Sequence, residues 1–255
     1  MIKLPTERIK ASRVNPRSII LFGKPKIGKT TAISQLKDCL IIDLEGGTDY
    51  VDALKVDIIK TAQEENLQPI KALKNLIDTL KKANEAAKGF VYKYGAIDTI
   101  SVLEDMVMPI ALNLYKNTVQ GRNFQGDNVL DLANGAGYQY TRKALWMVLE
   151  ELKECFETLI IISHLKDKLL EKDGKEMNER GIDLIGKSAT ILSAHVDALG
   201  YMYREDNETL VNFMASESIT CGSRCDHLKD KKIALITSDE SGKITVDWSK
   251  IFIKE

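Results

Sequence analysis

The residues best suited to chemistry in this 255-residue chain lie in one stretch near its N-terminus. An apolar run, Ser18 to Phe22, leads directly into a G-x-x-x-x-G-K-T pattern. Its residues, with the threonine that follows, are Gly23, Lys24, Pro25, Lys26, Ile27, Gly28, Lys29, Thr30 and Thr31. Glycine backbones can curl N–H groups around anionic oxygens, a lysine can reach the β- and γ-phosphates, and a threonine hydroxyl can bind Mg²⁺. The pattern therefore predicts a P-loop, with ATP and Mg²⁺ as cofactors.

A second candidate group follows the next apolar run. Cys39 to Leu44 reads as a strand, and the acidic residues Asp43 and Glu45 and a glycine pair come at its end. In open parallel sheets, ligands and chemistry gather at the carboxyl ends of strands. Glu45 is therefore expected beside the phosphates, where a carboxylate can orient or deprotonate the attacking water. The alternative is a strand-end acid that only caps the following turn.

Two later strands are expected to bring polar groups to the same edge. Tyr94 to Thr99 contains Asp98, the best candidate to hold Mg²⁺ together with Thr30, on a strand next to the P-loop strand. Thr158 to His164 is the most apolar strand, and it delivers His164, which can sense the γ-phosphate and signal to the following loop. A histidine that merely caps the strand end is the alternative.

Composition limits the classes of function. A hydrophobic content of 44% is enough for a large core, and the chain divides into a basic arm, residues 1–17, and one large domain, residues 18–255. The formal net charge of −1 argues against coating duplex DNA, so a nucleic-acid site must be local. No apolar run approaches the roughly 18 residues that span a bilayer, which predicts a cytoplasmic protein with no membrane partner, in the host cytoplasm if it is viral.

The cysteines are expected to be reduced. Four of them, Cys39, Cys155, Cys221 and Cys225, are too few for a disulfide scaffold in a chain of this length. Cys221, Cys225 and His227 have the spacing of part of a metal site, yet no second close pair completes tetrahedral zinc. Structural zinc therefore stays the minor alternative.

The remaining patterns predict alternating helices and strands. Apolar residues at helical spacing predict helices over 29–36, 69–88, 102–114 and 138–156, and further strands are expected at 56–59, 196–204, 209–215, 233–237 and 243–248. Residues 166–187, around Asp173-Gly174, predict a charged projecting hairpin. The fold class is thus α/β, a mainly parallel sheet flanked by helices with antiparallel strands at the C-terminal end.

Several loops are candidates for contact with single-stranded DNA. Residues 117–137 are rich in glycine and asparagine, and Arg122 and Phe124 there could pair a phosphate contact with a base-stacking ring. Lys166 and Lys168, at the base of the charged hairpin, and the basic arm are further candidates. A disordered connector over 117–137 and a solvated tail at the N-terminus are the alternatives.

The order of these motifs resembles the RecA-like core of P-loop ATPases. The P-loop, Asp43-x-Glu45-Gly46-Gly47, His164 and Gly222-Ser223-Arg224 resemble the phage-type RecA-like ATPases that act as single-strand annealing recombinases, over residues 18 to 230. The resemblance implies a RecA-like P-loop NTPase fold and Mg²⁺·ATP-dependent activity on single-stranded DNA in recombination, annealing or replication. It also favours Glu45 over Asp43 as the catalytic acid, and a homo-oligomeric ring or filament with composite ATP sites. A single-stranded DNA-binding protein is a further possible partner.

Arg224 is predicted to act in trans on the nucleotide that Lys29 of a neighbouring subunit holds. An arginine supplied across an interface stabilises charge on the γ-phosphate oxygens, and the turn Gly222-Ser223 can project it. The alternative is a surface arginine paired with Asp226 or Asp230. For the whole chain, a nucleotide-switched binding module that recruits a replication or recombination partner is the second hypothesis. A small-molecule P-loop kinase is the third, although no acceptor pocket is evident.

Overall fold

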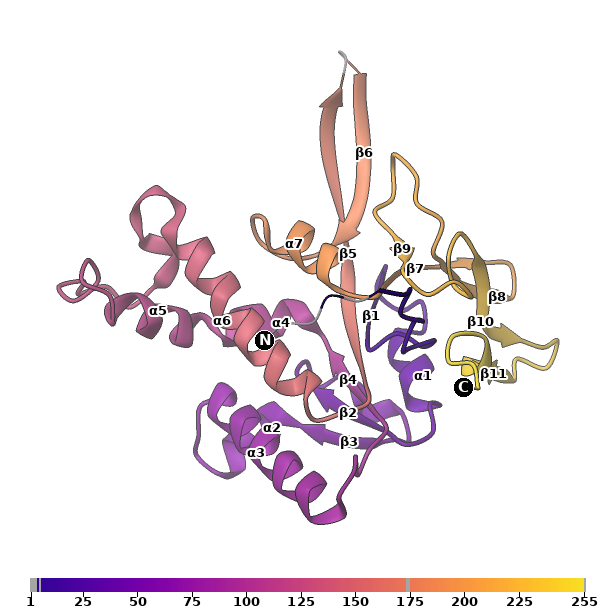
Figure 1. Ribbon diagram of the computed structural model, residues 1–255, viewed down its shortest axis with the longest axis horizontal. Helices are drawn as coiled ribbons and strands as arrows, with labels where there is room; N and C mark the ends of the chain where they lie inside the picture. The colour runs from indigo at the N-terminus through magenta and orange to yellow at the C-terminus, as the bar shows by residue number, and fades with distance from the viewer. Residues whose placement is uncertain (1–3, 5, 173–174, 255) are drawn as a thin grey trace.

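One mixed sheet organises the molecule (Figure 1). The computed structural model describes residues 4, 6–172 and 175–254, and within them eleven strands pair in the order β3-β2-β4-β5-β1-β7-β8-β10-β11, with β6 on β5 and β9 on β7. The strands are β1 (Ser18–Gly23), β2 (Cys39–Asp43), β3 (Leu54–Asp57), β4 (Tyr94–Asp98), β5 (Thr158–Lys172), β6 (Lys175–Ile182), β7 (Ala198–Glu205), β8 (Glu208–Asn212), β9 (Gly222–Ser223), β10 (Lys232–Ser238) and β11 (Ile244–Val246).

The pairing directions confirm the expected fold class. The run from β3 to β7 is parallel throughout, whereas β8, β10 and β11 extend the sheet with antiparallel pairs. A P-loop NTPase core with antiparallel strands at its C-terminal end is therefore present, as the RecA-like resemblance implied. Two of these pairs, β7 with β8 and β10 with β11, are hairpins with short connections, whereas residues 213–231 lie between β8 and β10.

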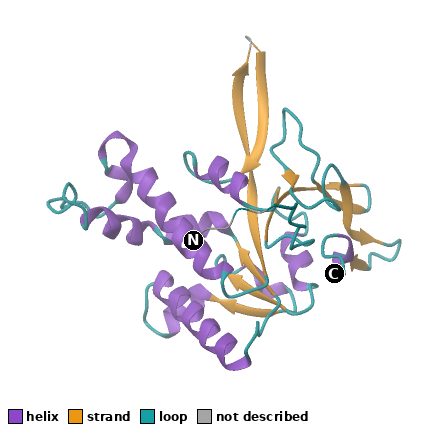
Figure 2. Cartoon of the chain, viewed as in Figure 1, coloured by secondary structure: helices purple, strands orange, loops and turns teal. Residues whose placement is uncertain are grey.

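Helices cover both faces of the parallel strands (Figure 2). The α-helices are α1 (Lys29–Ser34), α2 (Ile58–Glu64), α3 (Pro69–Ala87), α4 (Ile100–Met106), α5 (Met108–Lys116), α6 (Ala136–Lys153) and α7 (Ser188–His195). Four 3₁₀ turns are η1 (Gly47–Tyr50), η2 (Val129–Asp131), η3 (Ala133–Gly135) and η4 (Trp248–Lys250). None of the helices in these described residues is long and apolar enough to cross a membrane.

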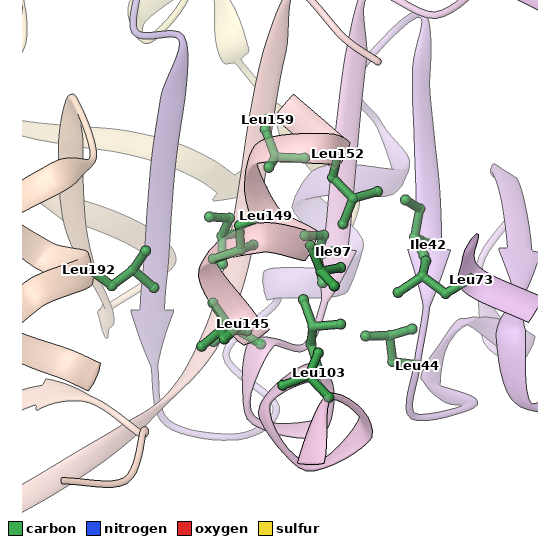
Figure 3. Packing of buried hydrophobic residues seen from close by; sticks show 14 of the residues in the cluster. Ile42, Leu44, Leu73, Ile97, Leu103, Leu145, Leu149, Leu152, Leu159 and Leu192 are labelled. Atoms are coloured by element: carbon green, nitrogen blue, oxygen red, sulfur yellow. The ribbon is translucent and has the colours of Figure 1, made fainter. Parts of the chain in front are cut away.

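The core has two parts, one on each face of the sheet, because side chains alternate along a strand. In β1, Ile20 and Phe22 pack with α3, α4 and α6, the cluster shown in Figure 3. Ile19 and Leu21 face the other way and pack with α1 and with Trp248 near the C-terminus. Strands buried on both faces are near-continuous apolar runs, as parallel strands under helices require.

The strand order corrects one expectation. The strand that carries Asp98 was expected to lie next to the P-loop strand, but β5 lies between β4 and β1. The register still brings the strand ends together: Asp43 lies opposite Asp98, and Gly23 opposite His164. Lateral order in a parallel sheet depends on how the crossover helices pack, and a motif on one strand does not encode it.

The structure also contains helices and a strand that the sequence patterns did not predict. Helices α2 and α7 and strand β9 were not expected, and the helix expected over 102–114 is two helices, α4 and α5, with Pro109 just after the break. Proline lacks the N–H that would continue the first helix. The segment over 117–137 is not a disordered connector, since it contains η2 and η3 and buries Val129.

The long hairpin is confirmed in its main feature. Strand β5 continues past the sheet, and its residues Leu165 to Lys172 pair with β6, so the two strands project from the body (Figure 1). The Asp173-Gly174 turn itself lies outside the described residues. In the N-terminal arm, the described residues before Ser18 form neither helix nor strand, and the division of the chain into arm and domain stays a prediction.

Candidate nucleotide site

The P-loop pattern lies between a buried strand and a helix, as expected. Strand β1 ends at Gly23 and α1 begins at Lys29, while Lys24, Pro25 and Lys26 are exposed at the turn. Gly28 has a φ of 101°, a left-handed conformation that favours glycine. A β-carbon on Gly23 would lie 2.4 Å from the carbonyl oxygen of Met202, so glycine is needed there as well.

Lys29 is buried inside this loop. Its side chain is 6% exposed, and Nζ donates hydrogen bonds to the carbonyl oxygens of Gly23 (3.0 Å) and Lys24 (2.9 Å). Burial lowers the pKa of Lys29, although the nearby carboxylates of Asp98 and Glu45 act in the opposite direction. The ammonium group is held by two backbone carbonyls, and the nearby carboxylates compensate its charge only in part. Such a group is suited to bind the phosphates of a nucleotide.

Thr30 and Asp98 form the second pair of the site. Thr30 Oγ1, on α1, donates to Asp98 Oδ2 over 2.7 Å, although β5 lies between β4 and β1, the strand before α1. Burial raises the pKa of Asp98, and the carboxylates of Glu45 and Asp43 raise it further against the opposing effects of Thr30 and Lys29. A buried carboxylate beside a hydroxyl is a pair of hard oxygen ligands, the kind that Mg²⁺ prefers. The two residues expected to hold the metal therefore meet.

Glu45, just after β2, contacts residues from β5 and from the end of β4. Its Oε1 accepts a hydrogen bond from Thr99 Oγ1, directly after β4, and lies 3.3 Å from His164 Nε2 on β5. The side chain is 33% exposed, so water can reach the carboxylate. Within the described part of the chain, Nδ1 of His164 is buried without a hydrogen-bond partner. The tautomer that donates from Nε2 to Glu45 is consistent with this arrangement, because it leaves no proton on Nδ1.

Thr99 is a site residue that the motifs did not indicate. It is 1% exposed and follows Asp98 through a cis peptide bond. Its only signal in the sequence is its place immediately after the acid at the strand end. In the structure its hydroxyl holds the carboxylate of Glu45 beside the Thr30–Asp98 pair.

Asp43 and Glu45 have different surroundings. Asp43 is 1% exposed and accepts hydrogen bonds from the backbone N–H groups of residues 45–48 and from the Thr48 hydroxyl, at 2.6 to 3.3 Å. Burial acts to raise the pKa of Asp43, but the donors at Thr48, Glu45 and Gly46 outweigh it and hold the pKa below its usual value. Asp43 is fully used in shaping the turn, which leaves Glu45 as the acid able to act on water.

Arg224 lies at the other edge of the sheet. Strand β9 pairs Ser223 with Ala198, at the start of β7, and Ala198 pairs with Ile19 at the start of β1. The guanidinium lies 3.5 Å from Asp197 Oδ1 and donates to carbonyl oxygens at the end of α7. Its ion-pair partner is therefore Asp197, and neither Asp226 nor Asp230. The structure does not bring Arg224 to the nucleotide site of its own chain.

The candidate DNA-binding side chains are partly engaged. The Phe124 ring packs edge-on against Tyr115, with centroids 5.7 Å apart, and Lys116 Nζ lies 5.9 Å from its centroid. Arg122 is exposed, whereas Lys166 Nζ forms an ion pair with Asp183 Oδ1 at 2.9 Å. The side chain of Lys168 lies outside the described residues. Packing against Tyr115 thus occupies the ring that was expected to stack on a base.

The cysteine and histidine cluster does not form a metal centre. Across the described residues, no group of three metal-ligating side chains converges. His227 Nε2 lies 2.9 Å from the carbonyl oxygen of Ile251, and Cys221 Sγ lies 3.0 Å from that of Met214. All four cysteines are free thiols. The thiols most buried have raised pKa values, about 12 for Cys39 and about 11 for Cys155 and Cys221.

Comparison with known proteins gives a family match and likenesses to solved structures. A family model described as an AAA domain matches residues 15–241. No curated protein matches the chain. Among solved structures, the crystal structure of a KaiC-like protein from the hyperthermophilic archaeon Pyrococcus horikoshii OT3 is similar, with 13% sequence identity, coverage of 90% of this chain and 89% of that chain, and a TM-score of 0.42.

Proposed function

The chain belongs to the AAA domain family whose model spans residues 15–241, and from that premise we propose that it hydrolyses ATP with Mg²⁺ at the carboxyl edge of its sheet. One observation carries this proposal. Lys29 is held by P-loop carbonyls at the start of α1, Thr30 bonds to Asp98 of β4, and Glu45 lies between Thr99 and His164 of the neighbouring strands. A phosphate cradle, a hard-ligand pair and a water-facing carboxylate are the parts that phosphoryl transfer to water requires.

Each side chain takes one role in this proposal. Lys29 balances the charge that develops on the γ-phosphate, and Glu45 accepts a proton from the attacking water. Thr99 and His164 orient the Glu45 carboxylate through its Oε1. Thr30 and Asp98 would hold Mg²⁺, which when bound neutralises phosphate oxygens and orients the leaving group.

A second copy of the chain is part of the proposal. Arg224 projects from the edge opposite Lys29 and is more than half exposed, so it has a route to a nucleotide only on a neighbouring copy. We assign it the role of a cation that acts in trans in a homo-oligomer with composite ATP sites.

Single-stranded DNA is the proposed partner, in recombination, annealing or replication. The RecA-like motif order supports it, together with the exposed Arg122, Lys166 at the base of the projecting hairpin, and the basic residues of the arm. The intramolecular pairing of Lys166 with Asp183 means that DNA phosphates would compete with a carboxylate there.

ATP turnover measured with and without single-stranded DNA tests the proposal. We expect DNA-stimulated phosphate release by the natural chain and none by Lys29→Ala. ATP binding with no turnover in either condition would contradict hydrolysis and favour a nucleotide-switched module that recruits a partner. Failure to bind ATP would overturn the site itself.

The salt dependence of DNA binding tests the proposed contacts. Each phosphate contact removed lowers the slope of log affinity against log salt by about one. We expect this change for Arg122→Ala and Lys166→Ala. Lys74→Ala is the matched control, because it removes one exposed positive charge from the distant helix α3. Slopes unchanged in the first two variants would place the DNA elsewhere.

A further inference from the structure

An exposed tyrosine lies where two loops meet. Tyr138, in the first turn of α6, is 46% exposed. β-Carbons built on Gly135, before α6, and on Gly186, between β6 and α7, would each lie 3.7 Å from a ring carbon of Tyr138. The ring therefore rests against two residues that have no side chains to cover it. The loop before α6 and the loop between β6 and α7 therefore meet at Tyr138.

The other rings of this region are packed. Phe124 meets Tyr115 edge-on, and Tyr115 meets Tyr140 at 5.3 Å between centroids. Both Phe124 and Tyr140 are packed against the main core. Tyr138 is thus the ring here that presents nearly half of its surface to solvent, and it has no aromatic partner within the described residues.

Both segments that meet at Tyr138 carry cations. Residues 132–149 and 184–196 contain no aspartate or glutamate, although acidic residues make up 37 of the 255 in the chain. They carry Arg142, Lys143 and Lys187. Arg142 lies four residues after Tyr138 and so on the same side of the helix, and Lys187 adjoins Gly186. Asp131 and Asp183 lie just outside these ranges, and Asp183 is paired with Lys166. Glu104 is 3% exposed and accepts a hydrogen bond from the Ile185 N–H.

The loop with Gly186 is also tied to the nucleotide site. The Asp183 N–H donates to Ser163 Oγ at 3.2 Å and to the His164 carbonyl oxygen at 3.1 Å, and the Ile185 N–H donates to Glu104 on α4 at 2.8 Å. A ligand on Tyr138 would therefore sit against a loop that is hydrogen-bonded to the strand end carrying His164.

We propose that Tyr138 stacks on a base of single-stranded DNA, with Arg142 and Lys187 beside the neighbouring phosphates. An exposed ring with cations on both adjoining segments matches such a strand, because every base offers a flat face and every linkage a negative charge. An acidic protein segment would match the cations but would leave the ring without its partner. The inference rests on the proposed function, in which single-stranded DNA is the partner, and it names Tyr138 as a residue that binds this DNA.

Binding of a labelled oligothymidylate, followed by fluorescence anisotropy, tests this residue. Stacking is worth about 1–3 kcal/mol per base, so Tyr138→Ala should weaken binding about 5- to 150-fold. Tyr138→Trp, which keeps an aromatic face, should bind within about threefold of the natural chain. Phe90→Ala is the matched control, since Phe90 is 47% exposed and lies beyond the end of α3. The salt slope should stay unchanged in Tyr138→Ala, because no phosphate contact is lost, and should fall by about one in Lys187→Ala.

An abasic strand of equal length separates stacking from charge. The natural chain should bind it as weakly as Tyr138→Ala binds oligothymidylate, and Tyr138→Ala should lose nothing further on it. Equal binding of oligothymidylate by Tyr138→Ala and the natural chain would overturn the inference while leaving the DNA partner in place. Polyglutamate that competes as well as DNA would overturn it in favour of an acidic protein partner. An active ATPase that binds no single-stranded DNA would overturn both the partner and the stacking residue, but not the ATPase.

Discussion

The two edges of the parallel sheet hold their polar groups in different ways. At the carboxyl edge, residues of α1, β4 and β5 and residues just after β2 and β4 form hydrogen bonds in two groups, so the site is assembled within one chain. At the amino edge, Arg224 has Asp197 as its partner and separates two cavities of about 410 and 490 Å³. A strand rises about 3.3 Å per residue, so β1 alone puts roughly 15 Å between the edges.

The difference shows where the proposed second copy would act. The carboxyl edge holds the candidate phosphate-binding lysine, the candidate metal ligands and the candidate base. The amino edge holds Arg224 next to open space. In the proposed oligomer, the amino edge of one copy would meet the carboxyl edge of the next, and the predictions below test each edge separately and then together.

The largest effect is expected from the carboxyl edge alone. Lys29→Ala should abolish ATP hydrolysis and weaken ATP binding, because the loop loses the buried ammonium that two backbone carbonyls now hold. Phosphate release and nucleotide binding, measured separately, check this. The far-ultraviolet circular dichroism should match that of the natural chain. If folded Lys29→Ala retained turnover, the carboxyl edge would not be the site of ATP hydrolysis.

The next effect tests whether the edges cooperate between copies. Arg224→Ala should lower turnover by about 10³-fold, the usual scale for an arginine supplied across an interface. Arg224→Ala keeps an intact nucleotide site and Lys29→Ala keeps an intact arginine. A mixture of the two should therefore recover part of the activity that each lacks. A mixture that stays inactive while both variants assemble, or full activity in Arg224→Ala alone, would contradict the role in trans.

A smaller effect is expected for the base at the carboxyl edge. Glu45→Gln should bind ATP normally and lower turnover by about 10²-fold, because the amide keeps an acceptor for Thr99 but cannot take a proton from water. Single-turnover phosphate release at saturating ATP measures this. Thr99→Ser keeps the hydroxyl and should stay close to the natural rate. The rate of Thr99→Val should lie between the natural rate and that of Glu45→Gln. An Asp43→Asn variant with the same loss as Glu45→Gln would show that the wrong acid was chosen.

Much of the carboxyl edge could be predicted from the sequence because its signals are local. The P-loop spacing and the apolar runs that end in Asp43, Asp98 and His164 each sit within a few residues. Parallel strands bring such ends to one edge whatever their order. Those residues were therefore expected together, and the hydrogen bonds from Thr30 to Asp98 and from His164 to Glu45 agree.

What could not be predicted depends on contacts distant in sequence. The place of β5 between β1 and β4 follows from helix packing, and the pairing of Arg224 with Asp197 follows from the meeting of β9 with β7. Phe124 looked like a free ring because its partner, Tyr115, lies on the preceding helix. Helix α7 has a mixed run of small, hydroxyl and apolar residues, and this composition gave it no clear helical period.

The smallest expected effect is on stability. It distinguishes Asp43 from Glu45, the two acids at the end of β2, because loss of Asp43 should lower the unfolding free energy more than the rate. Asp43→Asn should cost about 1–3 kcal/mol of unfolding free energy at pH 7, the scale of hydrogen bonds to a charged group, since an amide puts N–H groups against the backbone donors of the turn. Turnover should fall far less than in Glu45→Gln. Urea unfolding followed by circular dichroism measures the difference.

The pH dependence of this difference in unfolding free energy tests whether the charge of Asp43 is its cause. The pKa of Asp43 is lower in the folded chain than in the unfolded chain, where it is about 3.9, because the turn donors outweigh the effect of burial. Its stabilisation is therefore present above about pH 4 and is lost as the pH falls through the folded value. Asp98 has a raised pKa and works in the opposite sense. It is present in both proteins, and burial, the largest cause of its shift, is the same in both, while Asp43→Asn removes one of the smaller causes. The gap in unfolding free energy between the natural chain and Asp43→Asn should thus be constant from pH 7 to about 5 and narrow below about pH 4. A gap that stays constant down to pH 3 would mean that the charge of Asp43 does not hold the turn that presents Glu45.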